Sequence, residues 1–109
     1  MGMKLVIAIV SNDDTSNVTS TLTEHGYYVT KLSTSGGFLK TGNTTLLIGT
    51  EEEKVPALIE LIKQESRRRT EVVPANATFD INHYAAFPVE VLVGGATIFV
   101  LNVEDFIKA

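Results

Sequence analysis

A continuous apolar run near the start of the chain limits its possible folds more than any other feature. Leu5 to Val10 reads LVIAIV, with several β-branched residues and no polar interruption. Such a run is typical of a central strand that is covered on both faces. It is too short to span a membrane, and it lacks the cleavage pattern of a signal peptide. We therefore predict a buried first strand in a sheet.

Only two segments have helical signals. The first has N-cap candidates at 11–14, apolar residues at 18 and 22, and an end at His25-Gly26. It is rich in threonine, so tertiary packing must support it. The second follows Thr50-Glu51-Glu52-Glu53, which matches a capping box, and has amphipathic spacing at 55, 58, 59 and 62. Arg67 to Arg69 are expected to form a solvated helix end, and a partner or phosphate site is the less favoured alternative.

Further β-branched or alternating stretches predict strands at 27–32, 44–48, 89–93 and 97–101. Gly94-Gly95 separates the last two, which predicts a hairpin turn without a ligand role. Residues 70–87 are irregular and indicate a long loop that could hold a short strand. The tail at 102–109 is compatible with one helical turn. No linker or repeat divides the chain, so residues 1–109 are expected to form a single domain.

The predicted order is β-α-β-β-α-β with an extra C-terminal hairpin strand. This order indicates an α+β fold, a ferredoxin-like sandwich whose antiparallel sheet has two helices on one face. Two helices cannot cover both faces, and the strands are apolar on both sides. We therefore expect self-association to cover the second face, with a homotrimer that packs sheet against sheet as the expected form.

Composition excludes several classes of function. The 109 residues carry a formal net charge of −4, which argues against a general binder of DNA or RNA backbones. The chain has no cysteine, so neither disulfides nor thiolate metal sites are expected, and a cytoplasmic location is compatible with this. His83 has no paired carboxylates nearby, so no metal is expected. No nucleophile–base motif or P-loop is visible, so the protein is expected to be non-enzymatic, without a cofactor or a membrane partner.

Two sequence blocks resemble a known family. One is TSGGFLKTGNTT at 34–45, preceded by TKL, and the other is FPVEVLVGGATIFVL at 87–101. Together they resemble the PII-like cyclic-di-AMP receptors of Gram-positive bacteria, and the resemblance extends from Lys4 to about Phe106. It implies a PII-like homotrimer of the cytoplasm that senses a second messenger in signal transduction. The nucleotide would bind between subunits, and the signal would pass to an unknown downstream protein.

The resemblance also implies ligand-binding positions. Carried over by position, the contacts fall on Thr30, Gly37, Phe38, Leu39, Asn43 and Gly49. The neighbouring subunit would add Phe99 and the C-terminal region near Lys108. The chain departs from the family at Gly26 and Tyr28, where the family has Asn and Arg, and across residues 72–86.

These residue types suit cyclic di-AMP. The amides from Gly36 to Leu39 can form an anion nest, because glycine lets a ligand approach the backbone closely. Phe38 offers a face for base stacking, and Asn43 can pair with N6 and N7 of adenine. Loop 34–43 is expected to be mobile when empty and to become ordered on binding. Further contacts to a base or phosphate could come from Thr30, Tyr28, Lys31 and Lys40.

Two alternatives stay open. Tyr28 cannot supply the charge of the family's Arg, so the site could prefer a different adenine nucleotide such as ATP. The chain could also be a ligand-free adaptor trimer whose loops bind a protein. In that case Gly36-Gly37 would be an ordinary turn, Phe38 would pack within its own loop, and Asn43 would cap the following strand.

Overall fold

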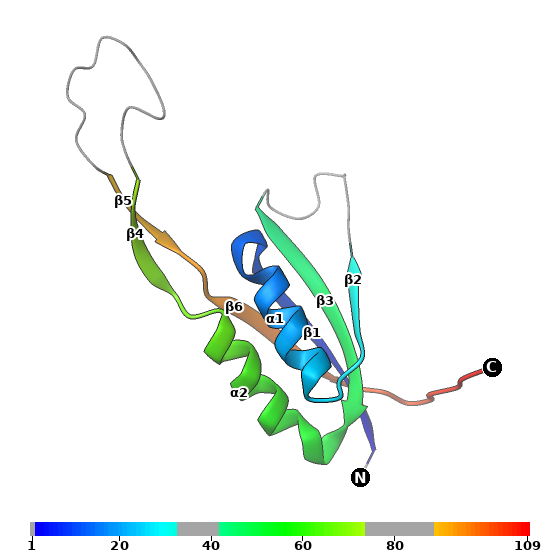
Figure 1. Cartoon of the computed structure of the whole chain (residues 1–109). Coiled ribbons are helices and arrows are strands. Elements are labelled where there is room, and N and C mark those ends of the chain that lie inside the picture. The colour runs from blue at the N-terminus through cyan, green and yellow to red at the C-terminus, as the bar shows by residue number, and fades with distance from the viewer. Residues whose placement is uncertain (1, 33–41, 74–88) are drawn as a thin grey trace.

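The computed structural model describes residues 2–32, 42–73 and 89–109. Figure 1 shows the arrangement of the elements. In chain order they are β1 (Met3–Ser11), α1 (Asn12–Glu24), β2 (Val29–Leu32), β3 (Asn43–Glu51), a 3-10 helix (Glu52–Lys54), α2 (Val55–Glu65), β4 (Arg69–Val73), β5 (Val89–Val93) and β6 (Ala96–Asn102).

The main sheet has four strands in the order β2-β3-β1-β6, and neighbouring strands are antiparallel. The first strand is therefore central, as its apolar run predicts. Ile7 on β1, for example, lies opposite Leu47 on β3 and Phe99 on β6. Both helices lie on the same face of this sheet (Figure 1). The α+β class and the ferredoxin-like layering are confirmed.

The core lies between the helices and the two middle strands. Val6, Ala8 and Val10 of β1 are fully buried, and Leu46 and Ile48 of β3 lie beside them. The helices contribute Val18, Leu22, Val55, Leu58 and Ile62 to the same cluster. Burial of each large aliphatic side chain contributes roughly 1.5–3 kcal/mol. Packing of this kind holds α1 in place despite its threonine-rich sequence.

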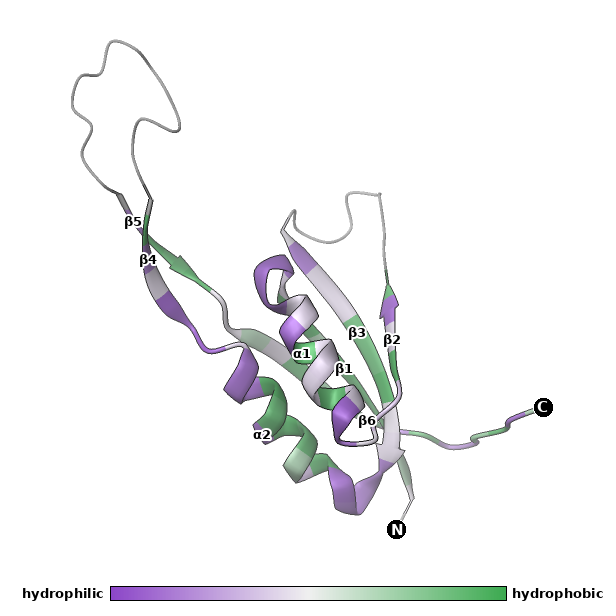
Figure 2. Ribbon diagram, viewed as in Figure 1, coloured by the Kyte–Doolittle hydropathy of each residue, from purple (hydrophilic) through white to green (hydrophobic). Residues whose placement is uncertain are grey.

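The opposite side of the sheet, which we call the open face, is not covered by either helix (Figure 1). Leu5, Ile7 and Ile9 alternate with the buried residues of β1 and therefore point to this face, where they are half-buried. On β6, Phe99 and Leu101 lie opposite Ile7 and Leu5 and are 51% and 43% exposed. Apolar residues run along these strands in Figure 2. The strands are thus apolar on both faces, while the helices cover only one.

The predicted C-terminal hairpin is wrong. β5 pairs with β4 in a separate two-stranded ribbon, whereas β6 pairs with β1 and completes the main sheet. Gly94 and Gly95 have φ values of 83° and 90° and join the two sheets. A glycine pair between two apolar stretches permits a change of sheet as readily as a reversal, because glycine accepts positive φ without steric cost. The fourth strand of the ferredoxin-like sheet is therefore β6.

Local signals at the helix ends succeed for α1 and fail for α2. The Ser11 side chain caps α1 by accepting a hydrogen bond from the Asp13 amide, and Gly26, with φ of 88°, follows its end. The predicted capping box is wrong, because Thr50 is buried within β3 and no side chain caps the 3-10 helix or α2. The tail after Asn102 contains no helix, so the predicted helical turn is also wrong.

Candidate functional site

Six of the predicted ligand residues lie in the described part of the chain, and four of them are strand residues on the open face. One row of cross-strand partners crosses the whole sheet. Thr30 of β2 pairs with Leu47 of β3, and Ile7 of β1 pairs with both Leu47 and Phe99 of β6. Gly49 lies opposite Leu5 in the next row, and Asn43 begins β3 at the end of the same face. The sheet thus places Thr30, Asn43, Gly49 and Phe99 on one surface that the helices leave uncovered.

These residues do not converge within one chain. Thr30 and Phe99 are separated by three strand spacings, which is roughly 14 Å across the sheet. Asn43 and Gly49 lie six positions apart on β3, which is roughly 20 Å along the strand. One small ligand cannot contact all four on a single copy of the sheet.

Asn43 has the surroundings of a residue available for binding. It is half-buried, and no hydrogen bond of its side chain occurs among the described residues. The residues on either side of Asn43 are held by Asn12 instead. The Asn12 backbone N–H donates to the Gly42 carbonyl at 2.7 Å, and the Thr44 hydroxyl donates to the Asn12 side-chain oxygen. The start of β3 is therefore fixed while the carboxamide keeps its donors and acceptor.

Tyr28 and Lys108 meet within one chain. Tyr28 is 86% exposed just before β2, and Lys108 Nζ lies 6.0 Å from the centre of its ring. This is the outer limit of a cation–π contact. The pair lies near Gly49, because Val29 pairs with Ile48, and thus far along β3 from Asn43. An exposed aromatic ring and a cation therefore stand together at this end of the sheet.

The remaining predicted residues divide into two groups. Lys31 alternates with Thr30 and faces the helix side, where it lines a hollow of about 670 Å³ between α1 and β2. Outside the described residues lie Gly36, Gly37, Phe38, Leu39 and Lys40.

For the arginines after α2 the sequence favoured a solvated helix end over a partner or phosphate site, and two of them have defined surroundings. The predicted solvated helix end is wrong for Arg69. This residue begins β4 and donates two hydrogen bonds, of 2.9 and 3.3 Å, to the buried Asp14. That hydrogen bonding raises the pKa of Arg69, so it stays cationic. Arg68 lines two hollows and has no partner for its guanidinium among the described residues.

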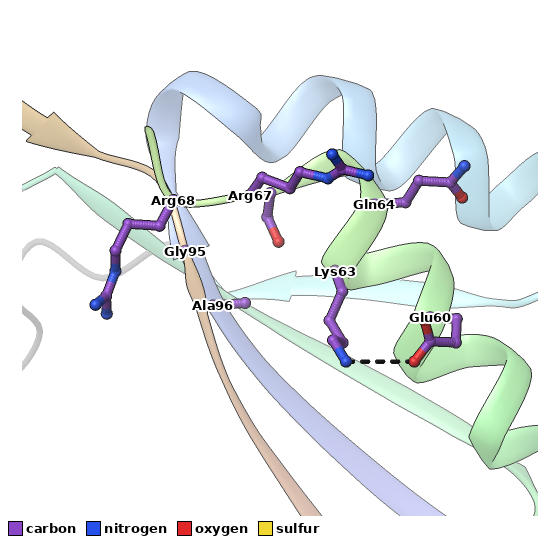
Figure 3. Close-up of a pocket in the computed structure, with 8 residues that line it drawn as sticks. Glu60, Lys63, Gln64, Arg67, Arg68, Gly95 and Ala96 are labelled. Carbon is purple, nitrogen blue, oxygen red and sulfur yellow. Dashed lines mark hydrogen bonds and ion pairs between the residues drawn. The ribbon is translucent and has the colours of Figure 1, made fainter. Parts of the chain in front are cut away.

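The larger of these hollows measures about 580 Å³ and lies at the end of α2 (Figure 3). Lys63, Arg67 and Arg68 supply its cationic groups, and Lys63 forms an ion pair with Glu60 at 3.4 Å. In Figure 3 the side chains of Arg67 and Arg68 leave the chain in different directions. The guanidinium groups of Arg67 and Arg68 therefore do not converge in this hollow.

The described residues contain no group of three or more His, Cys, Asp or Glu side chains that could hold a metal ion. None of the helices in these residues is long and apolar enough to cross a membrane.

The arrangement of helices and strands is that of the PII-like proteins. PII from Arabidopsis thaliana, solved with citrate bound, is similar to this chain with a TM-score of 0.59 at 24% identity. The alignment covers 97% of this chain and 79% of that one. At this identity the similarity shows the fold alone.

The sequence profile of the cyclic-di-AMP receptors matches residues 3–109, so the chain belongs to the cyclic-di-AMP receptor family. A functionally unknown protein from Pediococcus pentosaceus, known from its crystal structure, is 42% identical with a TM-score of 0.78. That alignment covers 100% of this chain and 99% of the other. The family resemblance carried by the two sequence blocks is confirmed, and with it a role in nucleotide-binding signal transduction.

Proposed function

We propose that this chain is a non-enzymatic sensor that binds cyclic di-AMP where copies of it meet. The observation that carries the proposal is the position of Thr30, Asn43, Gly49 and Phe99 on the open face. They are too far apart to contact one ligand on one sheet, so a neighbouring copy supplies the missing side of the site. Membership of the cyclic-di-AMP receptor family supports the choice of ligand.

The apolar open face supports assembly of the chain into a homotrimer. Phe99 and Leu101 are half exposed beside Leu5 and Ile7, and burial of such a surface is the main driving force of association. In a closed ring each copy presents the same surface to its neighbours. Phe99 of one copy then lies near a residue such as Thr30 on another.

The residue chemistry of the proposed site matches a cyclic dinucleotide. The Asn43 carboxamide pairs with an adenine edge, and Phe38 stacks on a base. Backbone amides at Gly36 and Gly37 receive a phosphate. Binding then changes the conformation of loop 34–43, and that change is what a downstream protein detects.

Calorimetric titration with cyclic di-AMP, cyclic di-GMP and ATP tests the proposal. We expect the strongest binding with cyclic di-AMP. Phe38→Ala and Asn43→Ala each weaken it by about 1–3 kcal/mol, whereas Asn17→Ala, on the exposed side of α1, leaves it unchanged. Limited proteolysis at loop 34–43 should change only with the ligand that binds.

The other outcomes of the same experiment identify the alternatives. Preference for ATP would assign the site to a different adenine nucleotide. No heat and no thermal shift with cyclic di-AMP would reject the proposed ligand. Unchanged proteolysis with every nucleotide, together with a protein partner recovered by pull-down, would favour the ligand-free adaptor.

A further inference from the structure

Arg68 is held against the glycine joint that links the two sheets. It lies in the short link between α2 and β4, and the Gly95 amide donates a 2.5 Å hydrogen bond to the Ser66 carbonyl in that link. Gly94 is equally close: a methyl group on it would lie 2.4 Å from the Arg67 carbonyl oxygen. Because the link and the joint are in direct contact, the backbone of Arg68 has a fixed position.

The Arg68 guanidinium extends over Gly95. A methyl group built on Gly95 would lie 3.5 Å from Arg68 Nε and 4.0 Å from one terminal nitrogen. In Figure 3 the side chain points away from both Lys63 and Arg67. The charge of Arg68 is therefore directed away from the cationic groups at the end of α2.

On that side Arg68 lines a small cavity of about 140 Å³, which we call the Arg68 cavity. At roughly 30 Å³ for each water in the liquid, this volume equals four or five waters, enough for one phosphate group. Its lining residues are Ile9, Asn43, Arg68, Gly94, Gly95, Ala96 and Thr97. Ile9 and Thr97 are cross-strand partners, so the cavity lies where the open face meets the start of β3.

The charges around the cavity favour an anion. Arg69 is already bound to Asp14, and Lys63 to Glu60. Among the described residues, Arg68 has no such partner and no acidic side chain lines the cavity. An unpaired guanidinium is a planar fork of donors that suits a phosphate oxygen pair. Asn43 also lines the cavity, and the one carboxamide N–H that an adenine contact leaves unused can donate there.

We infer that Arg68 is a phosphate-contacting residue of the nucleotide site, with Asn43 in the same cavity and Gly95 leaving room for the guanidinium. The inference rests on the proposed function for its ligand, but the anion contact has a test of its own. Arg67 provides the matched control, because it is the same residue type one position earlier and does not line the Arg68 cavity.

The first arm of the test is calorimetry of the full-length chain with cyclic di-AMP. Loss of a charged hydrogen bond to phosphate should weaken binding about 10- to 100-fold in Arg68→Ala. Arg68→Lys should lose less, since lysine keeps the charge but not the fork. Arg67→Ala should bind like the unmodified chain. Equal binding by Arg68→Ala and the unmodified chain would overturn the inference and leave the proposed function intact.

The second arm uses inorganic phosphate and does not require cyclic di-AMP to bind. Millimolar phosphate should shift the amide signals of Gly94, Gly95 and Asn43 in nuclear magnetic resonance spectra of the unmodified chain and of Arg67→Ala. In Arg68→Ala the shifts should be absent. If cyclic di-AMP fails to bind but these Arg68-dependent shifts appear, the proposed function falls and the anion contact stands. If phosphate shifts nothing and cyclic di-AMP does not bind, both fall.

Discussion

The Arg69 guanidinium binds both carboxylate oxygens of Asp14, at 2.9 and 3.3 Å, and so joins the first turn of α1 to the start of β4. Asp14 is 3% exposed. The Arg69 nitrogen that bonds Asp14 Oδ2, Nη1, also donates to the Arg67 carbonyl at 3.0 Å. One side chain thus fixes α1, the link after α2 and the base of the β4–β5 ribbon relative to one another.

Removal of the Asp14 charge should therefore destabilise the fold. Asp14→Asn leaves the Arg69 guanidinium beside a buried amide that can accept only one of its hydrogen bonds. We expect the thermal unfolding midpoint, measured at fixed protein concentration, to fall by several degrees. Asp13→Asn is the control, because it removes an exposed carboxylate from the same helical turn. Equal midpoints for the two variants would show that the ion pair does not contribute.

Gly94 should be far less replaceable than Gly26. Both have positive φ, 83° and 88°, so Gly→Ala costs about 1–2 kcal/mol in backbone strain at either position. Only at Gly94 would the new methyl group meet other atoms, at 2.4 Å from the Arg67 carbonyl oxygen and 2.6 Å from an Arg69 nitrogen. We expect Gly94→Ala to lose a further 1–3 kcal/mol or so in urea unfolding. Similar losses in both variants would contradict the close packing of the joint.

The Gly94-Gly95 joint also marks the limit of what the sequence could predict. Element types followed from local patterns: Leu5 to Val10 indicated the central strand, and Ser11 and Gly26 marked the ends of α1. The partner of a strand is not a local property. The stretches on either side of Gly94-Gly95 have the same apolar pattern, and only the tertiary structure assigns one to the ribbon and the other to the sheet.

The candidate site shows the same division. Asn43 and Phe99 could be chosen from the family resemblance, since each lies in a recognisable block. Arg68 could not be distinguished from its neighbours, because a run of three arginines after a helix is explained first as a solvated end, with a phosphate site as the less favoured alternative. Arg68 differs from Arg69 because only Arg69 is paired with Asp14, and those two residues are 55 positions apart in the sequence. Long-range pairing of this kind leaves no periodic signal.

A charge on the open face should break the proposed trimer. Phe99→Glu places a carboxylate opposite Ile7, where the proposed assembly buries the surface. Light scattering should give about three times the chain mass for the unmodified protein and the mass of one chain for the variant. Leu92→Glu is the control, because Leu92 is 62% exposed on the ribbon and outside the main sheet. A monomeric unmodified protein would contradict the assembly.

Substitution of Gly49 can distinguish a role in ligand binding from a role in folding. It has no positive φ, and a methyl group on it would meet nothing within 4 Å in the chain. Gly49→Ala should therefore leave stability unchanged or raise it by about 0.5–1 kcal/mol, since glycine weakens a strand. If a ligand lies against the backbone beside Thr30, however, the methyl group occupies its place. We expect calorimetry to show at least tenfold weaker binding of cyclic di-AMP, with an unfolding midpoint no lower than that of the unmodified chain. Undiminished affinity would show that Gly49 is not part of the site, because a methyl group on Gly49 would then touch neither the chain nor the ligand.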